Sequence, residues 1–550
     1  EGRLLGALAY RFGTFPKEPL AGITPIEKML PVLELPQTEP ARLAHVDPRR
    51  WSLPVLPAVA GAVVDFGDEE SEGASAREYA GTAPRNPDLW ELAAGLQPSA
   101  SGIAAGDPGA GFRWRGGGGE LLRPIETPLV FSSIDPSVLS LYRDRLRRLG
   151  LFPVQGGAAA SAAGAPKATR FEAGSPIAAQ LVRGDIDVSA SGTVTYLSEG
   201  KLLAFGHPFL RSGSIDMPFA AARVLVTVPS LDNSFKMTVS GESLGVLRQD
   251  RLTAIAGQVG EPAEMIAVRL AIDSAGSAPR NVSFEVFRDP IWAPLVLEIA
   301  MASSLVNALD FSLPATVSLE GVLRFEGHPD FHLANVFSGP GTPLTVQQTA
   351  ARYLTSIFAV LYANRFETPR LRGIEVQIEQ RPERRFVVVE DLWLSRTRVA
   401  PGETVTARAF LRPYHGERYH RDFEIRIPPG LPPGRVSVLI GGGQAIQAHT
   451  QRLLRVRLMQ SETLDQMMEV LSDLPRYDRL YARLVRRSRG GILKQREVPG
   501  LPPSVSRVLR SSEVRGDFTP HREEILLEQH ADLDGTVYGG RRMVLRVESR

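Results

Sequence analysis

Residues 192–207 read Gly-Thr-Val-Thr-Tyr-Leu-Ser-Glu-Gly-Lys-Leu-Leu-Ala-Phe-Gly-His, and this stretch decides the fold class. Its β-branched and aromatic residues form two short runs separated by Ser-Glu-Gly, which is typical of two strands joined by a tight turn. Similar runs occupy residues 177–182, 186–188, 222–228 and 234–239. Several short strands punctuated by Gly, Asp and Ser predict a β-barrel or a β-sandwich.

The composition of the chain agrees with a mainly β protein of several domains. Its 550 residues correspond to about three to four domains, and its 51 Gly and 43 Pro favour turns and short strands over long helices. The 63 Lys and Arg against 61 Asp and Glu leave a net charge of +2, which provides no overall attraction to nucleic acid or an anionic membrane.

Several classes of chemistry find no support in the residues. The chain has no Cys, which excludes disulfides, thiolate-bound metals and thiol nucleophiles. It contains no P-loop, no G-x-G-x-x-G after a strand and no H-E-x-x-H. No apolar run reaches the roughly 18–20 residues of a membrane-spanning helix. We therefore expect no cofactor, no metal and no transmembrane segment in this chain.

Helices and further strands are expected outside the barrel. Asp135-Pro136 predicts a helix N-terminus, with apolar residues at helical spacing up to residue 149, and Thr342-Pro343 opens a second helix. A capping box at 463–466 opens a third, which Pro475 ends. Residues 374–427 alternate apolar and polar side chains, and we interpret them as an immunoglobulin-like sandwich.

His207 is the candidate catalytic residue. It follows a predicted strand in Ala-Phe-Gly-His-Pro, where the preceding Gly allows close approach and the Pro directs the chain away. An imidazole at a strand end can act as a general base, or it can simply cap a turn through a backbone hydrogen bond. Asp216, nine residues further on, could orient this imidazole, but it could equally cap a turn.

Other polar residues fit structural roles better. Ser212 and Ser214 in Arg-Ser-Gly-Ser resemble a nucleophile motif but are close enough to His207 in sequence to share its loop, and Ser175 is interpreted in the same way. Asp185 and Asp187 alternate with apolar residues and are expected to face solvent from a strand.

Two segments of the chain resemble the SpoIVB family of serine peptidases. The first comprises 192–196, 200–207, Ala-Arg-Val at 222–224 and Ser-Gly-Glu-Ser-Leu-Gly at 240–245, and it is similar to the family's histidine-bearing segment. The second comprises Gly-Arg-Leu-Leu-Gly-Ala at 2–7, Gly-Ile-Thr-Pro-Ile-Glu at 22–27 and Met-Leu at 29–30. It is similar to the stretch that follows the family's nucleophile motif, G-M-S-G-S-P. Together the resemblances cover residues 1–30 and 175–270.

The resemblance implies a trypsin-like arrangement of β-barrels, a serine nucleophile and a histidine general base. By position the histidine is His207, and the motif serine is expected upstream of Glu1. The serine-flanking segment comes first here, whereas in the sporulation enzyme it comes second, so we expect a rearranged segment order. The resemblance also implies a protein or peptide substrate and a periplasmic, cell-envelope or secreted location.

The predicted organisation has six regions. The serine-flanking segment (1–35) is followed by a low-complexity insert (36–125) and the histidine-bearing segment (126–278). An α+β region (279–370), the sandwich (371–440) and a C-terminal α+β region (441–550) follow. Within the third region, residues 156–165 predict a Gly- and Ala-rich linker. An alternative hypothesis is a catalytically inactive envelope scaffold that binds partners through the sandwich region, residues 374–427, and the basic stretch after it. Residues 476–510, with ten basic and two acidic residues, could contact nucleic acid, but they lack interleaved aromatic residues and fit a solvated edge better, so no nucleic-acid partner is expected.

Overall fold

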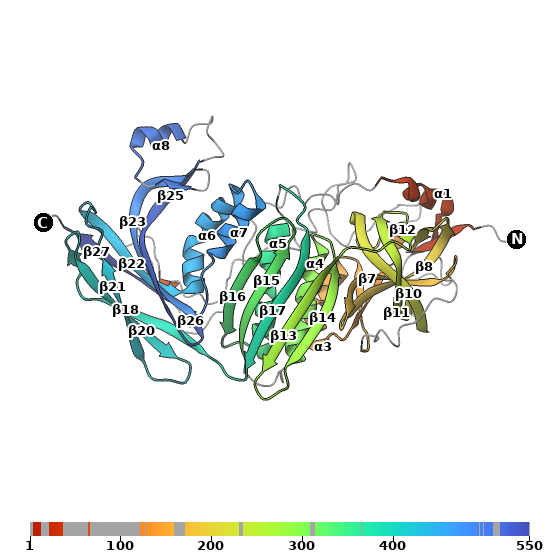
Figure 1. Ribbon diagram of the computed structural model, residues 1–550, viewed down its shortest axis with the longest axis horizontal. Helices are drawn as coiled ribbons and strands as arrows, with labels where there is room; N and C mark the ends of the chain where they lie inside the picture. Colours follow the sequence, from red (N-terminus) through yellow and green to blue (C-terminus); the bar gives the residue numbers. More distant parts are fainter. Residues whose placement is uncertain are drawn as a thin grey trace.

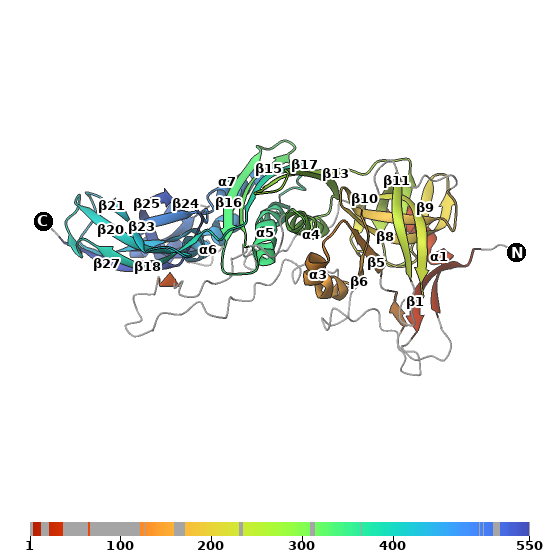
Figure 2. The same ribbon diagram turned by 90° about the horizontal axis from the view of Figure 1, so that it is seen from below.

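A computed structural model describes residues 4–12, 21–36, 64–65, 122–125, 127–158, 171–229, 235–308, 314–362, 364, 366–493, 496–498, 500–509 and 518–548. The protein is mainly β, as the composition predicts. Three units follow one another along the long axis, with a barrel at one end, a sheet with helices in the middle and a sandwich at the other end (Figures 1 and 2). The predicted insert, apart from β3 (Val64–Asp65) and β4 (Leu122–Pro124), and most of the predicted linker lie outside the described residues.

The histidine-bearing segment forms a closed, six-stranded antiparallel barrel. Its strands are β7 (Pro176–Gly184), β8 (Asp187–Ser198), β9 (Lys201–Ala204), β10 (Gly213–Val228), β11 (Phe235–Asp250) and β12 (Ile255–Val259). They pair in the order β7-β10-β11-β12-β9-β8, and the pairing of β7 with β8 closes the ring. β10 and β11 each have 16 residues, so both are much longer than the runs that predicted them.

A small sheet and helices accompany the barrel. β1 (Gly6–Phe12) pairs with β2 (Ala21–Pro25) on one side and with β4 on the other, and α1 (Ile26–Met29) and the 3-10 helix η1 (Leu30–Glu34) follow. β5 (Thr127–Ser132) extends the large sheet from β8 and pairs in parallel with β6 (Leu151–Gln155). Between them α3 (Pro136–Arg148) begins as predicted, since the Asp135 side chain accepts the Ser137 N–H at 2.8 Å.

The central sheet continues directly from the barrel. Its strands are β13 (Met265–Ser274), β14 (Arg280–Phe287), β15 (Thr316–Phe325), β16 (Phe331–Ser338) and β17 (Leu371–Arg381). They stand in the order β16-β15-β17-β13-β14, and β14 pairs with β7. Gly184 has a φ of +124°, and a Cβ there would lie 2.7 Å from the carbonyl oxygen of Ser283, so this close approach requires glycine.

Helices cover one face of the central sheet (Figure 2). α4 (Trp292–Val306) connects β14 to β15, and α5 (Pro343–Tyr362) connects β16 to β17 and begins where Thr342-Pro343 predicted it. Every residue of α4 is buried, because it lies between the sheet and its helical neighbours. Alternate side chains of β13, such as Val268 and Leu270, face these helices, while Arg269 faces solvent.

The C-terminal unit is a two-sheet sandwich. One sheet has the order β21 (Tyr419–Arg426), β20 (Thr404–Pro413), β18 (Phe386–Leu394) and β26 (Thr536–Tyr538). The other contains β19 (Arg398–Val399), β27 (Gly540–Val547), β22 (Gly434–Gly442), β23 (Arg479–Leu493) and β24 (Arg496–Val498), with β25 (Phe518–Asp532) paired to β23 and β3 to β27. α6 (Gly443–Met459) and α8 (Pro503–Leu509) contact this unit, while α7 (Leu464–Ser472) packs its apolar face into the core of the central unit beside α5 and β16.

The sandwich differs from the predicted one in its boundaries. Residues 374–381 alternate well but belong to β17 of the central sheet, and β18, β20 and β21 pack their apolar faces against β22, β23 and β27. A period of two residues identifies strands but does not say which sheet they join. The basic residues of β23 pair with acidic ones of β25, as in Arg479–Asp532, Arg483–Glu528 and Arg486–Glu524.

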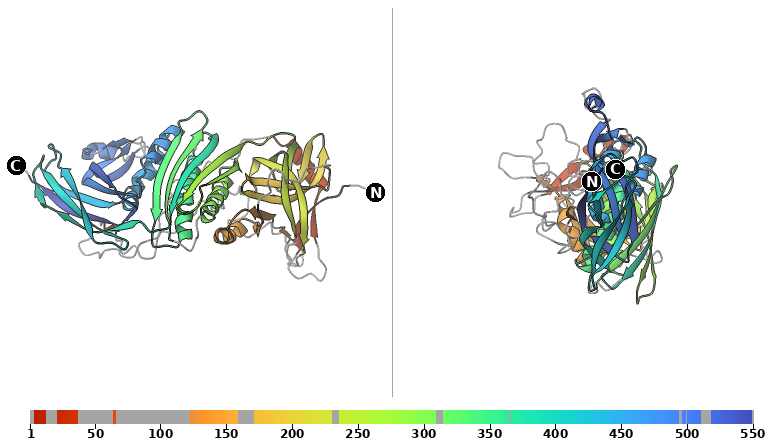
Figure 3. Two further views of the ribbon diagram at one scale, coloured as in Figure 1. Left: turned by 60° about the horizontal axis from the view of Figure 1, so that its bottom comes forward. Right: turned by 90° about the vertical axis from the view of Figure 1, so that its left-hand side faces the viewer.

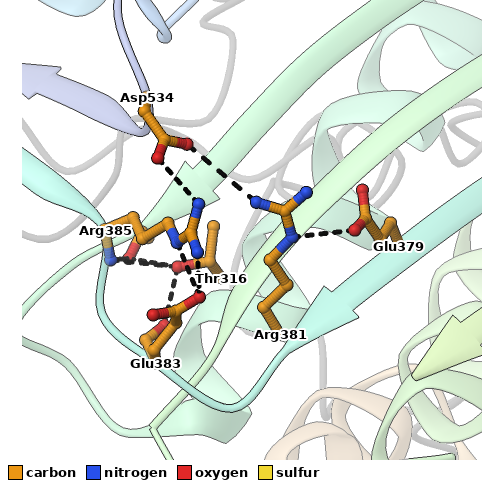
Figure 4. Close-up of polar contacts among 7 residues, drawn as sticks. Thr316, Glu379, Arg381, Glu383, Arg385 and Asp534 are labelled. Atoms are coloured by element: carbon orange, nitrogen blue, oxygen red, sulfur yellow. Dashed lines mark hydrogen bonds and ion pairs between the residues drawn. The ribbon is translucent and has the colours of Figure 1, made fainter. Parts of the chain in front are cut away.

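Polar contacts join the central sheet to the sandwich where β17 leads into β18 (Figure 4). The Thr316 hydroxyl donates to the carbonyl oxygen of Glu383 at 2.7 Å and accepts the Arg385 N–H at 3.1 Å. The Arg385 guanidinium lies 2.7 Å from Asp534, next to β26. The end-on view shows the units placed one behind another (Figure 3).

Replacing Leu270 with Ala tests the packing of the central sheet against its helices. Leu270 is buried, so the substitution leaves a cavity and should lower the free energy of unfolding by about 2–5 kcal/mol. The measurement is urea unfolding followed by circular dichroism. Arg269→Ala, on the solvent face of the same strand, is the control and should leave the unfolding curve almost unchanged; equal curves for both variants would contradict this packing.

Candidate active site

A strained turn carries His207. β9 ends at Ala204, and Phe205 and Gly206 then adopt φ values of +71° and +74°. Such a backbone costs a non-glycine residue energy, so Phe205 is held there by its surroundings. Its buried ring stacks on Phe209 at a centroid distance of 6.0 Å and meets the His207 ring edge-on at 5.9 Å. These aromatic contacts stabilise the turn and set the direction of the imidazole.

The hydrogen bond of His207 defines its tautomer. Nδ1 lies 3.0 Å from the carbonyl oxygen of Pro208. A carbonyl oxygen only accepts, so Nδ1 carries the proton and Nε2 of the neutral ring keeps its lone pair. The residue is 8% exposed, and burial lowers its pKa, although the Pro208 bond opposes this in part. The imidazole is therefore a neutral proton acceptor at neutral pH.

The N-terminal segment packs directly on this turn. A Cβ at Gly206 would lie 2.4 Å from the Cβ of Ala7 in β1, so only glycine permits the approach. Thr24, at the end of β2, donates its hydroxyl hydrogen to the carbonyl oxygen of Gly206 at 2.6 Å. Met29 packs in one apolar cluster with Leu203 of β9. Two segments about 180 residues apart in the chain thus meet at the residue preceding His207.

Asp216 does not reach His207. It lies within β10, where its carboxylate accepts from the Arg248 guanidinium at 2.9 Å and from the Glu264 N–H at 3.2 Å. Within the described residues its carboxylate makes no hydrogen bond to the imidazole, and its backbone contact is to the loop that precedes β13.

Asp250 organises the loop after His207, and sequence analysis did not identify it. Its carboxylate accepts the N–H of Phe209 at 2.9 Å, of Leu210 at 2.6 Å and of Ser212 at 3.4 Å. Burial raises its pKa, and these N–H donors counteract the rise. No sequence pattern marks this residue, because β10 and β11 pair Gly213 with Asp250 only in the folded sheet.

A second buried carboxyl group, that of Asp289, lies beside this loop. It accepts the N–H groups of Ile291 and Trp292 at 2.8 Å each at the start of α4. Burial raises its pKa, and the negative charge of Asp250 adds to the rise. The two carboxyls thus lie close together, one bound to the His207 loop of the barrel and the other to the first turn of a central helix.

Most of the other polar residues considered from the sequence have structural partners, and Ser212 lies in the loop that Asp250 holds. Ser214 is buried in β10, and the Ser175 hydroxyl accepts the Glu172 N–H at 3.0 Å. Asp185 is exposed, as predicted, and accepts the Ser283 N–H. Asp187 was expected to face solvent but is largely enclosed, and it accepts hydrogen bonds from Ser189 at 2.7 Å and Ser240 at 3.4 Å. Its neighbours on β11 enclose it, which strand periodicity does not reveal.

Comparison of the chain with protein-family models, with curated proteins and with solved structures finds no match. Among the described residues, no group of three or more His, Asp and Glu side chains is arranged to hold a metal ion. None of the described helices has both the length and the apolar composition needed to cross a membrane. The geometry of the site therefore carries the functional argument.

Histidine NMR tests the environment of His207. Its pKa is lowered by burial, so its ¹³Cε1 resonance should titrate with a midpoint below the usual 6.5. The associated stability is present above pH 6.5 and is lost as the pH falls through the lowered pKa. His328 is the internal comparison. Desolvation lowers the pKa of its imidazole, but the carboxylates of Asp465 and Glu367, at 2.8 Å and 3.3 Å from its two ring nitrogens, raise this pKa by more. Its midpoint should lie above 6.5.

The variants His207→Gln and His328→Gln assign the two resonances. If the resonance lost in His207→Gln titrates at or above pH 6.5, the buried and neutral imidazole is not the state in solution.

Asp250→Asn tests the support of the His207 loop. The amide nitrogen would face N–H donors, so the variant should lose about 1–3 kcal/mol of stability. Hydrogen exchange measured by mass spectrometry should accelerate across residues 205–212. Asp216→Asn, which loses only a partly exposed ion pair, is the matched control and should change stability by less than about 1 kcal/mol and leave exchange at 205–212 unchanged. Unchanged exchange in Asp250→Asn would show that the carboxylate does not hold the loop.

Proposed function

We propose that this chain is the histidine-bearing part of a SpoIVB-type serine endopeptidase that cleaves protein substrates in or beyond the cell envelope. His207 is the general base. The serine that it activates belongs to the nucleophile motif of the family. In the family this motif directly precedes the segment that residues 2–30 of this chain resemble. The substrate is a protein or peptide chain, and no nucleic acid takes part.

One observation carries the proposal. The two segments that resemble the family are separated by most of the first 200 residues, yet Ala7 and Thr24 of one contact Gly206 of the other. A nucleophile and its base must lie within hydrogen-bond reach of each other. A motif serine immediately before β1 would approach the barrel on the side that carries His207.

The architecture is consistent with this interpretation. A closed six-stranded antiparallel barrel is what a trypsin-like domain requires, and the histidine-bearing segment forms one. We propose that β1, β2 and β4 belong to the neighbouring, serine-bearing barrel in a rearranged order. We also propose that the two packed sheets of residues 386–547 correspond to the immunoglobulin-like region expected from the sequence.

The chemistry follows from the tautomer of His207. Nε2 takes the proton from the serine hydroxyl as its oxygen bonds to the carbonyl carbon of the substrate. When the carbon–nitrogen bond breaks, the proton passes from Nε2 to the leaving amine. The carbonyl oxygen of Pro208 holds Nδ1–H throughout, the role that a carboxylate has in a Ser-His-Asp triad. Asp250 acts indirectly, as a positioning residue for the loop.

A second candidate function is a catalytically inactive envelope scaffold built on the same barrel. One observation favours it: His207 is almost fully enclosed, and within the described residues no carboxylate hydrogen-bonds to its ring. In this alternative the His-Pro turn only completes the barrel, and partners bind elsewhere.

The two functions are separated by a fluorophosphonate probe and a casein-cleavage assay, applied to the protein together with the residues encoded before Glu1. A peptidase should be labelled at one serine and should cleave casein. His207→Ala should reduce the cleavage rate at least about 10³-fold, with circular dichroism unchanged. His332→Ala, an exposed histidine of β16, is the matched control and should retain full activity.

Three results would overturn the peptidase proposal. These are the absence of a G-x-S-G-S-P element from the encoded residues before Glu1, a lack of labelling, or full cleavage by His207→Ala. The first two favour the scaffold, and the third removes His207 from the mechanism.

A further inference from the structure

The β10–β11 hairpin extends beyond the barrel as a two-stranded arm, formed by residues 222–228 and 235–240. The two strands are paired from Ala222 opposite Ser240 to Val228 opposite Phe235, with a register shift between Val224 and Val226. Contacts to the rest of the protein come from the β11 side, where Phe235 meets the Phe152 ring at a centroid distance of 5.7 Å and Lys236 donates to Thr193 at 3.2 Å. The arm is thus held through β11, and β10 forms its outer strand.

The outer edge of β10 has no strand partner along the arm. β7 pairs with Phe219, Ala220 and Ala221 and begins at Pro176, so the pairing stops there. In the described part of the chain no other strand takes up the edge of residues 222–228. A strand edge of this kind presents a row of N–H and C=O groups to any extended chain that comes alongside.

The side chains along this edge are apolar and exposed. Val224, Leu225 and Val226 are 36%, 56% and 50% exposed, and Arg223 carries the single charge of residues 222–228. The edge strand of the sandwich, β21, is different, because its sequence Tyr-His-Arg-Asp-Phe-Glu-Ile-Arg is rich in charged side chains. Charges protect an exposed edge from pairing with another chain, and the arm has only Arg223 where β21 has a row of charged side chains.

We propose that the arm is a docking site at which an extended, apolar and acidic segment of another protein adds a strand to β10. Main-chain hydrogen bonds would supply most of the binding, and side chains of the segment would contact the exposed Val224, Leu225 and Val226. The acidic character follows from Arg223. This inference goes beyond the proposed peptidase function and does not depend on it.

The size of the edge favours a peptide over a second copy of the chain. A stable dimer buries about 800 Å² on each partner and uses about 20–30 residues of each. Pairing of residues 222–228 with their symmetry mates would involve only seven residues of each copy. A single added strand of about seven residues is, by contrast, the usual extent of peptide binding by strand addition.

A synthetic peptide tests the proposal directly. The probe is fluorescein-labelled Glu-Val-Thr-Val-Leu-Val-Thr-Val-Glu, and its binding to the full chain is measured by fluorescence anisotropy. We expect saturable binding with a Kd below about 10⁻⁴ M. Leu225→Lys and Val226→Lys should each weaken binding at least about tenfold, because a lysine on the edge is the device that blocks strand pairing. Val508→Lys, at a 63% exposed valine of α8, is the matched control and should bind as the unaltered protein does.

A second probe tests the proposal on the unaltered protein, so the result does not depend on whether the lysine variants fold. The same peptide, N-methylated at alternate residues, loses the donors needed for strand addition, and it should not bind the unaltered protein. Failure of the unmodified peptide to bind, equal binding of the N-methylated peptide, or unchanged binding to Leu225→Lys and Val226→Lys would each overturn the proposal. Sedimentation showing a dimer that Val226→Lys abolishes would identify a second copy as the occupant and would overturn it as well.

Discussion

The hydrogen bonds along one edge of β7 are divided between two strands, and this division holds the barrel and the central sheet together. Residues 177–179 pair with β10 inside the barrel, and residues 182–184 pair with β14 of the central sheet. The opposite edge closes the barrel on β8. Gly184, at the last pair with β14, allows the two backbones to approach closely there, since a Cβ would lie 2.7 Å from the carbonyl oxygen of Ser283. The orientation of the barrel relative to the helix-covered sheet follows from this pairing.

The same region also connects the candidate site to the central helices. Asp250 binds the loop after His207 through backbone N–H groups, and Asp289, whose pKa the charge of Asp250 helps to raise, binds the first turn of α4. Both carboxyls are removed from water, so each depends on its N–H donors for stabilisation. A buried carboxyl that holds a loop by several backbone donors leaves that loop little freedom. The imidazole of His207 is thus placed by the barrel, by the aromatic stack of Phe205 and by the N-terminal strand at once.

Local patterns predicted the elements whose formation depends on neighbouring residues. Asp135-Pro136, Thr342-Pro343 and the capping box at Thr463 each predicted a helix that the structure contains, and the box is closed by reciprocal bonds between Thr463, Gln466 and the N–H of Glu462. Patterns that require a distant partner were less informative. The alternation at 374–427 identified strands but not that β17 joins the central sheet, and the basic run at 476–510 did not reveal the acidic residues of β25 that face it.

For the candidate site, the sequence by itself determined that a histidine stands at a strand end after glycine. It also determined the mainly β class, because turn residues and short apolar runs act over a few positions. Only the tertiary structure decided that Ala7 and Thr24 lie against Gly206. It also decided that Asp216 forms an ion pair with Arg248 and that Asp250 holds the loop after His207 by hydrogen bonds. The physical reason is that these contacts depend on strand register and barrel closure, which place residues side by side irrespective of their distance along the chain.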